Sequence, residues 1–383
     1  YKKICVVLLA ILSLLFGSTY VKAEKSKKIT IDDITAPSAI LVDADSGKVL
    51  YERNSREKRM CASITKVMTL LLAFEEIDSG RMKLSDEVIV SDHAASMTGS
   101  TVFLRSGDHI SLEEIIKSVV VASANDAAVA LAEHISGSEE KFVGQMNEKA
   151  QKLNMTDTIF KNCNGLDEEG HLTSAYDISI MSCELAKHEK VFTYTGIWMD
   201  NIKDGKTQLV NTNKLLKKYK GITGLKTGTT DGAGCCMVAT AKRHDVSLLS
   251  VVLGCKESDD RFSESAAILD YGFENFTYVP LKFDKSVLQP LKVVEGMVSE
   301  VGLDSVVPSK VLLNRAKVQK IKTKVEIDES ICAPVKKGQI VGKVMYILGD
   351  EIIDEGDIFA VDEVERMSFL KVFVIFMKSL MKV

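Results

Sequence analysis

Residues 62–69 read Ala-Ser-Ile-Thr-Lys-Val-Met-Thr and open a run that is nearly apolar on all sides as far as position 77. This pattern predicts a helix over 63–77, and apolar side chains around the whole circumference indicate that the helix is buried in the middle of a domain. Ser63 and Lys66 are three residues apart, so both side chains lie on one helix face with Cβ atoms about 5–6 Å apart. The lysine amine can therefore reach the serine hydroxyl.

The Ser-x-x-Lys pattern alone is not specific, because it occurs four more times in the chain. The other copies begin at Ser55, Ser138, Ser368 and Ser379. Lys66 differs from the other lysines because it lies on a helix made for burial, where a charged amine is costly unless it has a purpose. Desolvation and a second cation nearby would lower its pKa toward the range in which an amine acts as a base.

A second candidate motif, Ser123-Ala124-Asn125, lies between helices predicted over 112–121 and 126–135. Small residues at such a break let the chain turn into a cleft. Serine and asparagine also cap helix N-termini, so capping by Ser123 or Asn125 is the alternative interpretation.

The third candidate motif is Lys226-Thr227-Gly228, the only Lys-Thr-Gly in the chain, and Thr229 follows it. It lies at the end of a strand predicted over 222–227. A strand that ends in glycine lets a substrate backbone approach and add itself as a further strand.

The chain before residue 278 has predicted strands at both ends and helices between them. This order predicts one mixed α/β (α+β) domain over 24–277, whose antiparallel sheet is assembled from distant parts of the chain. The strands are predicted at 38–43, 48–51, 222–227, 236–241 and 247–253. Helices besides those already named are predicted at 139–153 and 258–272.

From about residue 278 the pattern changes to short alternating runs separated by Pro, Gly and Asp. These runs lie at 292–294, 310–313, 318–325 and 342–347. They predict a small all-β domain over 278–366. It contains no convergent set of catalytic residue types, so we expect a spacing or docking role.

The N-terminal segment 1–23 has the pattern of a secretory signal peptide. Lys2 and Lys3 precede an apolar run over 4–16, and small residues end the segment at Ala23. A transmembrane anchor is the alternative, but the run is shorter than the roughly 20 apolar residues that span a bilayer. We therefore expect export and cleavage.

The C-terminal segment 367–383 is mostly apolar, but Lys371, Lys378 and Lys382 interrupt it at spacings that form one stripe on a helix. An amphipathic helix of this length suits the interface of an anionic membrane. It is predicted to attach the protein to the outer face of the cytoplasmic membrane. A helix packed on the body of the protein is the alternative.

Composition argues against several classes of partner and cofactor. The net charge of −4 leaves no basic excess to neutralise a phosphate backbone, so we expect no nucleic-acid partner. Seven cysteines remain after the signal peptide, without disulfide-framework or metal-ligand spacing, so mostly buried free thiols, no metal and no cofactor are expected. The six histidines are scattered in polar surroundings, and no motif places one in a cleft for a Ser-His-Asp triad.

In their order along the chain the three motifs resemble those of the penicillin-binding protein and serine β-lactamase superfamily. The surrounding sequence is similar to that of the low-molecular-weight D-alanyl-D-alanine carboxypeptidases, and this resemblance covers residues 36–275. That family typically also carries a smaller β domain and an amphipathic C-terminal membrane anchor. The segments that carry the resemblance are 62–69, 123–127, 164–167, 224–230 and 260–262.

The resemblance implies a penicillin-binding fold and a serine peptidase that trims the stem peptides of peptidoglycan. Ser63 would attack the carbonyl between the two terminal D-alanines, with Lys66 as general base, and water would hydrolyse the acyl-enzyme. Ser123 would relay a proton to the leaving amine, and Asn125 would hold the substrate amide. β-Lactams imitate the substrate, so they should acylate Ser63 as covalent inhibitors.

The resemblance also assigns the third motif to substrate binding. Lys226 would keep the site positive, and Gly228 would let the substrate approach. Thr227, Thr229 and Arg261 would bind the free carboxylate, for which a guanidinium fork is well suited. The oxyanion hole would consist of the backbone N–H groups of the nucleophile and Thr229.

Two positions depart from the family pattern, and three related functions compete with the carboxypeptidase. Cys61 occupies a place that is usually proline, and Ala124 one that is often glycine. A β-lactamase of the efficient type would need an activating Glu with an Asn four positions later, and segment 167–173 lacks that Asn. A peptidoglycan DD-endopeptidase and a non-catalytic penicillin sensor or wall-binding module are the two remaining candidates.

Overall fold

The computed structural model describes residues 29–380, so the predicted signal peptide and the last three residues lie outside it. The first part of the chain is built on a five-stranded antiparallel sheet with the strand order β2-β1-β9-β8-β7. N-terminal strands thus pair with strands from a distant part of the chain, as the sequence predicted. The five strands are β1 (Ser38–Asp43), β2 (Val49–Arg53), β7 (Ile222–Thr230), β8 (Gly234–Arg243) and β9 (Val246–Cys255).

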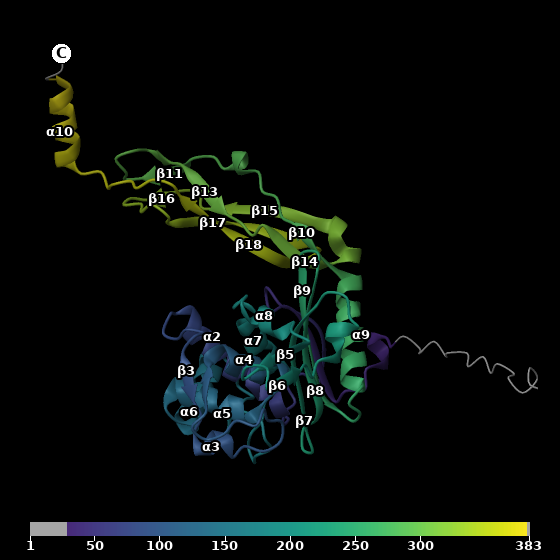
Figure 1. Cartoon of the computed structure of the whole chain (residues 1–383). Helices are drawn as coiled ribbons and strands as arrows, with labels where there is room; N and C mark the ends of the chain where they lie inside the picture. The colour runs from purple at the N-terminus through teal and green to yellow at the C-terminus, as the bar shows by residue number, and fades with distance from the viewer. Residues whose placement is uncertain (1–28, 381–383) are drawn as a thin grey trace, which may run out of the picture.

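Both faces of this sheet are covered, which explains why its central strands are apolar at almost every position. Helix α9 (Asp260–Asn275) lies on one face and the helical cluster on the other (Figure 1). Successive side chains of a strand point to opposite faces. Accordingly, Ala39 and Leu41 pack on the side of α9, whereas Ile40 and Val42 join the core of the helical cluster.

Helix α2 (Lys66–Asp78) lies in the middle of the helical cluster, and all its residues from Lys66 to Phe74 are buried. The prediction of a buried helix is therefore confirmed. The helices around it are α3 (Asp92–Ala95), α4 (Leu112–Val121), α5 (Asn125–Ser136), α6 (Glu139–Lys152), α7 (Ala175–Ala186) and α8 (Val191–Thr195). Smaller elements are the hairpins β3 (Glu87–Ile89)–β4 (His109–Ser111) and β5 (Met199–Ile202)–β6 (Thr207–Val210), with short 3₁₀ turns η1 (Ile31–Asp33) and η3 (Lys214–Lys217).

Two local predictions need correction in this region. Ser63 does not lie on the α-helix itself but on the 3₁₀ turn η2 (Ala62–Thr65), and α2 begins only at Lys66. Side chains three apart eclipse each other on a 3₁₀ helix, so the Ser–Lys pair still meets. Helices α7 and α8 were not predicted; α7 is buried on several sides, so it lacks the one-sided apolar stripe that marks an amphipathic helix.

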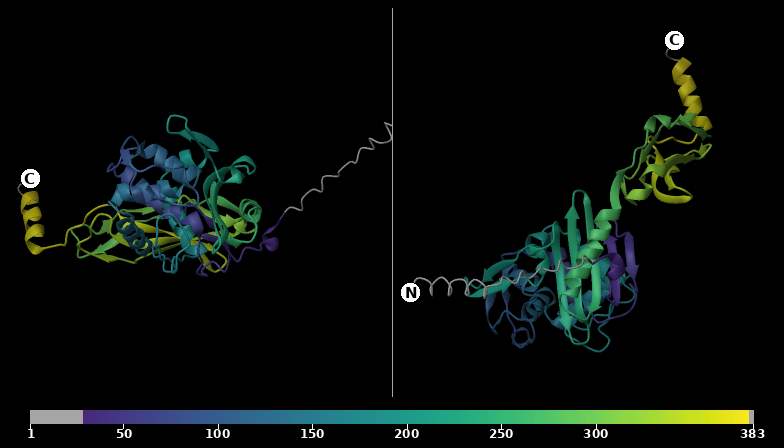
Figure 2. Two further views of the ribbon diagram at one scale, coloured as in Figure 1. Left: turned by 60° about the horizontal axis from the view of Figure 1, so that its bottom comes forward. Right: turned by 90° about the vertical axis from the view of Figure 1, so that its right-hand side faces the viewer.

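The C-terminal part is all β, with an apolar core of its own. It extends beyond the end of α9, away from the helical cluster (Figure 2). The segment predicted as one strand over 318–325 instead starts within the 3₁₀ turn η5 (Arg315–Lys320), and its strand begins at Ile321. Its strands are β10 (Phe276–Pro280), β11 (Leu291–Val294), β12 (Glu300–Val301), β13 (Leu303–Val306), β14 (Lys310–Asn314), β15 (Ile321–Ile327), β16 (Ile331–Cys332), β17 (Ile340–Leu348) and β18 (Glu351–Ala360), with a 3₁₀ turn η4 (Lys285–Val287).

The last described element is α10 (Phe369–Leu380), which lies at the far end of the β-rich part (Figure 1). The apolar side chains described on it are exposed to solvent; Phe369, for example, is 87% exposed and Phe373 47%. The alternative of a helix packed on the protein body is therefore wrong. Among residues 29–380, no helix is long and apolar enough to cross a membrane.

Candidate active site

Lys66 is completely buried and donates hydrogen bonds to three acceptors. Its Nζ atom lies 2.9 Å from Ser63 Oγ, 2.7 Å from Asn125 Oδ1 and 2.7 Å from the Asn164 carbonyl oxygen. A neutral amine has two N–H groups and one lone pair. If the N–H groups bind Asn125 and Asn164, the lone pair points at the serine hydroxyl and can accept its proton.

Burial of the Lys66 amine favours its neutral form. Desolvation lowers the pKa of Lys66 from 10.5 to about 7, although Cys163, Asp126 and Cys61 act in the opposite direction. A substantial fraction of Lys66 is therefore unprotonated at neutral pH. The apolar helix around Lys66 predicts this lowering of its pKa, and the direction is confirmed.

Ser123 and Lys226 form the second pair of the site. Lys226 Nζ donates to Ser123 Oγ at 2.7 Å and to the Thr227 carbonyl at 3.0 Å. The pKa of Lys226 lies well below its usual value because the amine is buried and because Lys66 and Arg261 are cations. Ser123 has φ of +58°, a conformation that costs about 1–3 kcal/mol and is concentrated at functional sites.

The capping interpretation of the second motif is wrong. The N-cap of α5 is Ala124, and among residues 29–380 the first-turn N–H of Ala127 is bound by Asp126 Oδ1 rather than by Ser123 or Asn125. Asn125 instead accepts from Lys66 and donates from Nδ2 to the Thr98 carbonyl at 2.7 Å. The next residue, Asp126, is also buried and accepts from two backbone N–H groups of the segment that follows Thr98, so it fixes that segment beside the motif.

Arg261 reaches the third motif from α9. Its Nη1 donates to the Gly228 carbonyl at 3.0 Å and to Thr229 Oγ1 at 2.7 Å. Its buried Nε has no hydrogen-bond partner within residues 29–380. The hydroxyl of Thr227 donates to Thr212 Oγ1 at 2.6 Å.

Two glycines allow the motifs to approach the backbone of the nucleophile turn. A Cβ at Gly228 would lie 3.0 Å from the nitrogen of Ser63, and one at Gly165 would lie 2.0 Å from the Ala62 carbonyl oxygen. Gly165 also has φ of +88°, which favours glycine in any case. The strand β7 that carries Gly228 is the edge of the sheet, so its outer side can accept another strand.

One buried histidine contradicts the expectation that all histidines lie in polar surroundings. His171 Nε2 lies 2.9 Å from Thr65 Oγ1, inside the Ser-x-x-Lys turn, and its Nδ1 accepts from the Lys161 N–H at 3.3 Å. Burial lowers the pKa of His171 to about 4, so it is neutral at physiological pH. Its sequence neighbours are polar, and only the folding of its loop beneath α2 buries it.

The thiol of Cys61 lies next to the hydrogen-bonded pair of His171 and Thr65, with its sulfur 3.4 Å from Thr65 Oγ1. Burial raises its pKa to about 11, so it is a thiol and not a nucleophilic thiolate. All seven cysteines in the described part of the chain are free, and five of them are buried. Across the same residues no group of three or more His, Cys, Asp or Glu side chains could hold a metal ion.

Comparison with known proteins places the chain in a family. The family profile described as D-alanyl-D-alanine carboxypeptidase matches residues 22–257, and the profile of the penicillin-binding protein 5 C-terminal domain matches residues 276–366. The D-alanyl-D-alanine carboxypeptidase DacF of Bacillus subtilis is 38% identical over 95% of this chain and 94% of its own length.

Solved structures agree with the sequence comparison. Penicillin-binding protein 5 from Haemophilus influenzae superposes with a TM-score of 0.79 at 30% identity, over 87% of this chain and 98% of its own. Penicillin-binding protein D2 from Listeria monocytogenes, in its ampicillin-bound form, covers 62% of this chain and 97% of its own, with a TM-score of 0.57 and 29% identity. The chain therefore belongs to the D-alanyl-D-alanine carboxypeptidases, the serine peptidases among the low-molecular-weight penicillin-binding proteins.

Proposed function

We propose that the enzyme removes the terminal D-alanine from peptidoglycan stem pentapeptides through an acyl-enzyme on Ser63. The observation that carries this proposal is the 2.9 Å contact between Ser63 Oγ and the buried Lys66 amine. A weakly acidic hydroxyl becomes a nucleophile when a base with a suitable pKa lies within hydrogen-bond reach. Of these two residues, Ser63 is the one that is partly open to solvent and substrate.

In the acylation step, the Ser63 proton moves to the lone pair of Lys66 while Oγ attacks the carbonyl carbon between the two D-alanines. The backbone N–H groups of Ser63 and Thr229 would receive the developing oxyanion. The C–N bond then breaks as Ser123, with Lys226 hydrogen-bonded behind it, relays to the leaving amine the proton that Lys66 took from Ser63, so that both Lys66 and Ser123 regain their starting states. Water hydrolyses the ester and restores the serine.

Substrate binding would use the edge of β7 and the cations beside it. The peptide backbone would lie along Lys226, Thr227 and Gly228 as an added strand, and Asn125 would hold the substrate amide. The free carboxylate would bind to Arg261 and Thr229, which already share a 2.7 Å hydrogen bond. The pairing of Thr227 with a neighbouring threonine supports a role in shaping the strand rather than a direct contact.

The test of this function is the release of D-alanine from diacetyl-Lys-D-Ala-D-Ala by the purified protein. A cross-linked muropeptide dimer, supplied in parallel, distinguishes the endopeptidase alternative. Release of D-alanine with an intact cross-link supports the carboxypeptidase. Cleavage of the dimer alone would favour the endopeptidase, and neither reaction, with penicillin still bound covalently, would favour a penicillin sensor.

Penicillins should acylate Ser63, because they imitate the acyl-D-Ala-D-Ala end and the site offers the same carboxylate-binding cation. The ester should hydrolyse slowly. Rapid turnover of penicillin would instead support the β-lactamase alternative.

Replacing Arg261 by glutamine is expected to raise the KM for diacetyl-Lys-D-Ala-D-Ala by about 10- to 100-fold. The reason is the loss of a charged hydrogen bond to the substrate carboxylate, worth about 1.5–3 kcal/mol. Steady-state kinetics of D-alanine release measure the change. Arg243→Gln is the matched control, since Arg243 also contacts α9, through Asp270 at 3.2 Å, but lies at the other end of β8. An unchanged KM in Arg261→Gln would exclude this role.

The division of the chain fits the same function. We propose that residues 24–277 carry the catalysis, and that residues 278–366 hold this part away from the membrane surface. The distance between the helical cluster and α10 in Figure 1 supports a spacing role. Segment 1–23 would act as a signal peptide, so that the enzyme works on the wall outside the cytoplasm.

Deleting residues 367–383 is expected to abolish binding to vesicles of phosphatidylglycerol and phosphatidylcholine and to leave D-alanine release unchanged. The exposed apolar side chains of α10 need a nonaqueous partner, and lysines favour an anionic lipid surface. Vesicle co-sedimentation measures the binding. A double variant, Phe369→Glu with Phe373→Glu, keeps the chain length, and it should also stay in the supernatant; sedimentation of either variant would contradict membrane attachment through α10.

A further inference from the structure

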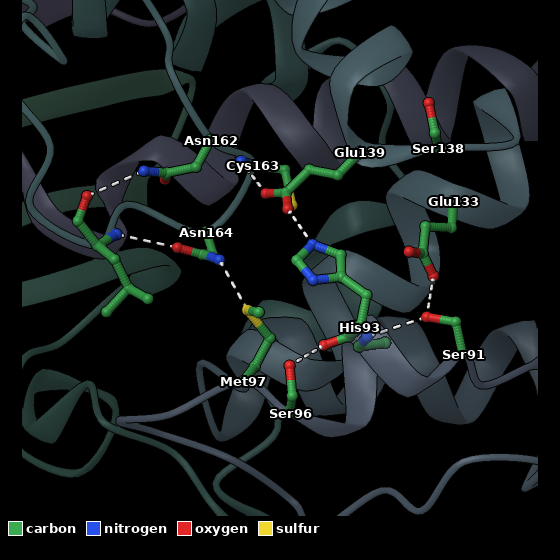
Figure 3. Close-up of polar contacts among 12 residues, drawn as sticks. Ser91, His93, Ser96, Met97, Glu133, Ser138, Glu139, Asn162, Cys163 and Asn164 are labelled. Atoms are coloured by element: carbon green, nitrogen blue, oxygen red, sulfur yellow. Dashed lines mark hydrogen bonds and ion pairs between the residues drawn. The ribbon is translucent and has the colours of Figure 1, made fainter.

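A hydrogen-bonded pair lies behind the catalytic lysine, outside the three motifs. Glu139 is the first residue of α6, and its Oε2 lies 2.7 Å from Nε2 of His93 on α3. Figure 3 shows the Glu139 carboxylate between the His93 ring and Cys163. No hydrogen bond within residues 29–380 joins any of the three residues to Ser63, and none of the three was predicted to take part in catalysis.

The carboxylate of Glu139 holds the chain at Cys163 from one side. Its Oε1 accepts the backbone N–H of Cys163 at 3.0 Å. From the other side, Thr69 Oγ1 on α2 donates to the Cys163 carbonyl at 2.6 Å. Two helices therefore clamp the residue that precedes Asn164.

Asn164 has weaker restraints of its own. Its Oδ1 accepts the Leu166 N–H at 2.9 Å within the same turn, and its Nδ2 faces the sulfur of Met97 at 3.7 Å. A thioether is only a weak acceptor. The Asn164 carbonyl, which accepts from Lys66 at 2.7 Å, is held by the clamp at Cys163 on one side and, on the other, by the Gly165 N–H of the same peptide unit, which donates to Asn162 Oδ1 at 2.7 Å.

Glu139 is ionised and lies in the first turn of α6, but it does not serve as the N-cap of that helix. Burial alone would raise its pKa, but the hydrogen bonds from Cys163 and His93 outweigh burial and lower it, so the group is an acceptor-only carboxylate at neutral pH. The N-cap of α6 is Ser138, whose side chain accepts from the Lys141 N–H. The Glu139 carboxylate is thus not the cap and is directed at Cys163.

We propose that Glu139, oriented by His93, is a positioning residue for acylation: it holds the Asn164 carbonyl where that group directs the lone pair of Lys66 at Ser63. The inference rests on the proposed function, in which Lys66 is the general base. A displacement of about 1 Å in a reacting group can cost about 100-fold in rate. The effect should therefore appear in the chemical step and not in ligand binding.

The experiment measures the first-order acylation constant k2 and the binding constant K for a fluorescent penicillin by stopped flow. Glu139→Ala should lower k2 by about 10- to 100-fold, with K changed less than twofold, and Glu139→Gln should lie between because its amide oxygen can still accept from Cys163. The matched control is Glu140→Gln, on the next and more exposed residue of α6, which should match the unmodified protein. Thermal unfolding of each variant monitors folding.

If Glu139→Ala does not fold, two variants of His93 test the positioning role instead. His93→Ala should lower k2 severalfold, and His93→Gln should restore it, because the glutamine amide N–H can donate to Glu139 in place of the imidazole. A general loss of packing would not be rescued in this way. Unchanged k2 in folded Glu139→Ala, or equal k2 in the two His93 variants, would overturn the inference.

A Lys66→Met variant separates the role of Glu139 from that of the catalytic base. If Lys66→Met acylates as fast as the unmodified protein, the proposed base is wrong, and the positioning role is overturned with it. If Lys66→Met is strongly impaired while the Glu139 and His93 variants are not, only the positioning role is overturned.

Discussion

Replacing Ser63 by alanine is expected to abolish both covalent labelling by fluorescent penicillin and the release of D-alanine from diacetyl-Lys-D-Ala-D-Ala. Alanine has no oxygen to form the ester, and within residues 29–380 the Lys66 amine contacts no other hydroxyl. Gel fluorescence and mass spectrometry of a proteolytic digest measure the label. We expect it on the peptide that contains Ser63 in the unmodified protein and on no peptide in the variant.

Ser55→Ala is the matched control, because Ser55 also begins a Ser-x-x-Lys pattern but hydrogen-bonds to Glu52 on β2, away from the other motifs. This variant should be labelled at the normal rate. Loss of one side-chain hydrogen bond costs only about 1 kcal/mol, so it should remain folded. A label that persists in Ser63→Ala would refute the assignment of the nucleophile.

Replacing Lys66 by methionine is expected to lower the acylation rate by about 100- to 10,000-fold, the range that a general base contributes. Methionine is unbranched and apolar, so it can follow the path of the lysine stem in the buried helix. Removing the desolvated amine relieves its burial cost but leaves the Asn125 and Asn164 acceptors unpaired, and because these two effects oppose each other, the melting temperature should stay near that of the unmodified protein. Stopped-flow acylation and calorimetry together separate the loss of the base from a loss of the fold.

The pH dependence gives the same prediction a second readout. The pKa of Lys66 is lowered to about 7, so below that pH the amine becomes protonated and cannot accept the serine proton. Acylation by the unmodified protein should therefore fall about tenfold per unit below pH 7, and it should level off above it. The residual rate of Lys66→Met should lack this limb.

Lys58→Met is the control for this substitution. Lys58 is the lysine of the Ser55 pattern, and its side chain is half exposed beside Asp157 at 3.9 Å. Both the rate and the pH limb should be those of the unmodified protein. A normal acid limb in Lys66→Met would show that another group accepts the proton.

Local patterns in the sequence were enough to predict the elements that carry the motifs. The apolar run after Ser63 predicted the buried helix α2, and the β-branched runs near Lys226 predicted β7 together with its neighbours β8 and β9. Such predictions succeed because the spacing of apolar residues along consecutive positions reflects the period of a helix or strand. An element that is buried on all sides is likewise recognised by a continuous apolar run. The Ser–Lys spacing likewise predicted a contact within one turn, whether the turn is α or 3₁₀.

Contacts between distant segments could not be predicted in this way. His171 looked like a surface residue because its neighbours are polar, but its loop folds under α2 and brings it to Thr65. Lys66 donates to the backbone carbonyl of Asn164. Because every residue type has the same backbone carbonyl, no sequence pattern indicates this acceptor. The Asn-Gly-Leu-Asp segment was recognised by family resemblance, but its role was not.

The sequence by itself determined the chemistry that is available: a serine and a lysine one turn apart on a buried element, and two further motifs with complementary groups. Only the tertiary structure decided which atoms meet. The pairing of Thr227 with Thr212 and the clamp of Glu139 on Cys163 are such contacts. The physical reason is that hydrogen bonds depend on distance and angle within tenths of an ångström, and the packing of whole layers sets these, whereas side-chain periodicity reports only which face of an element is buried.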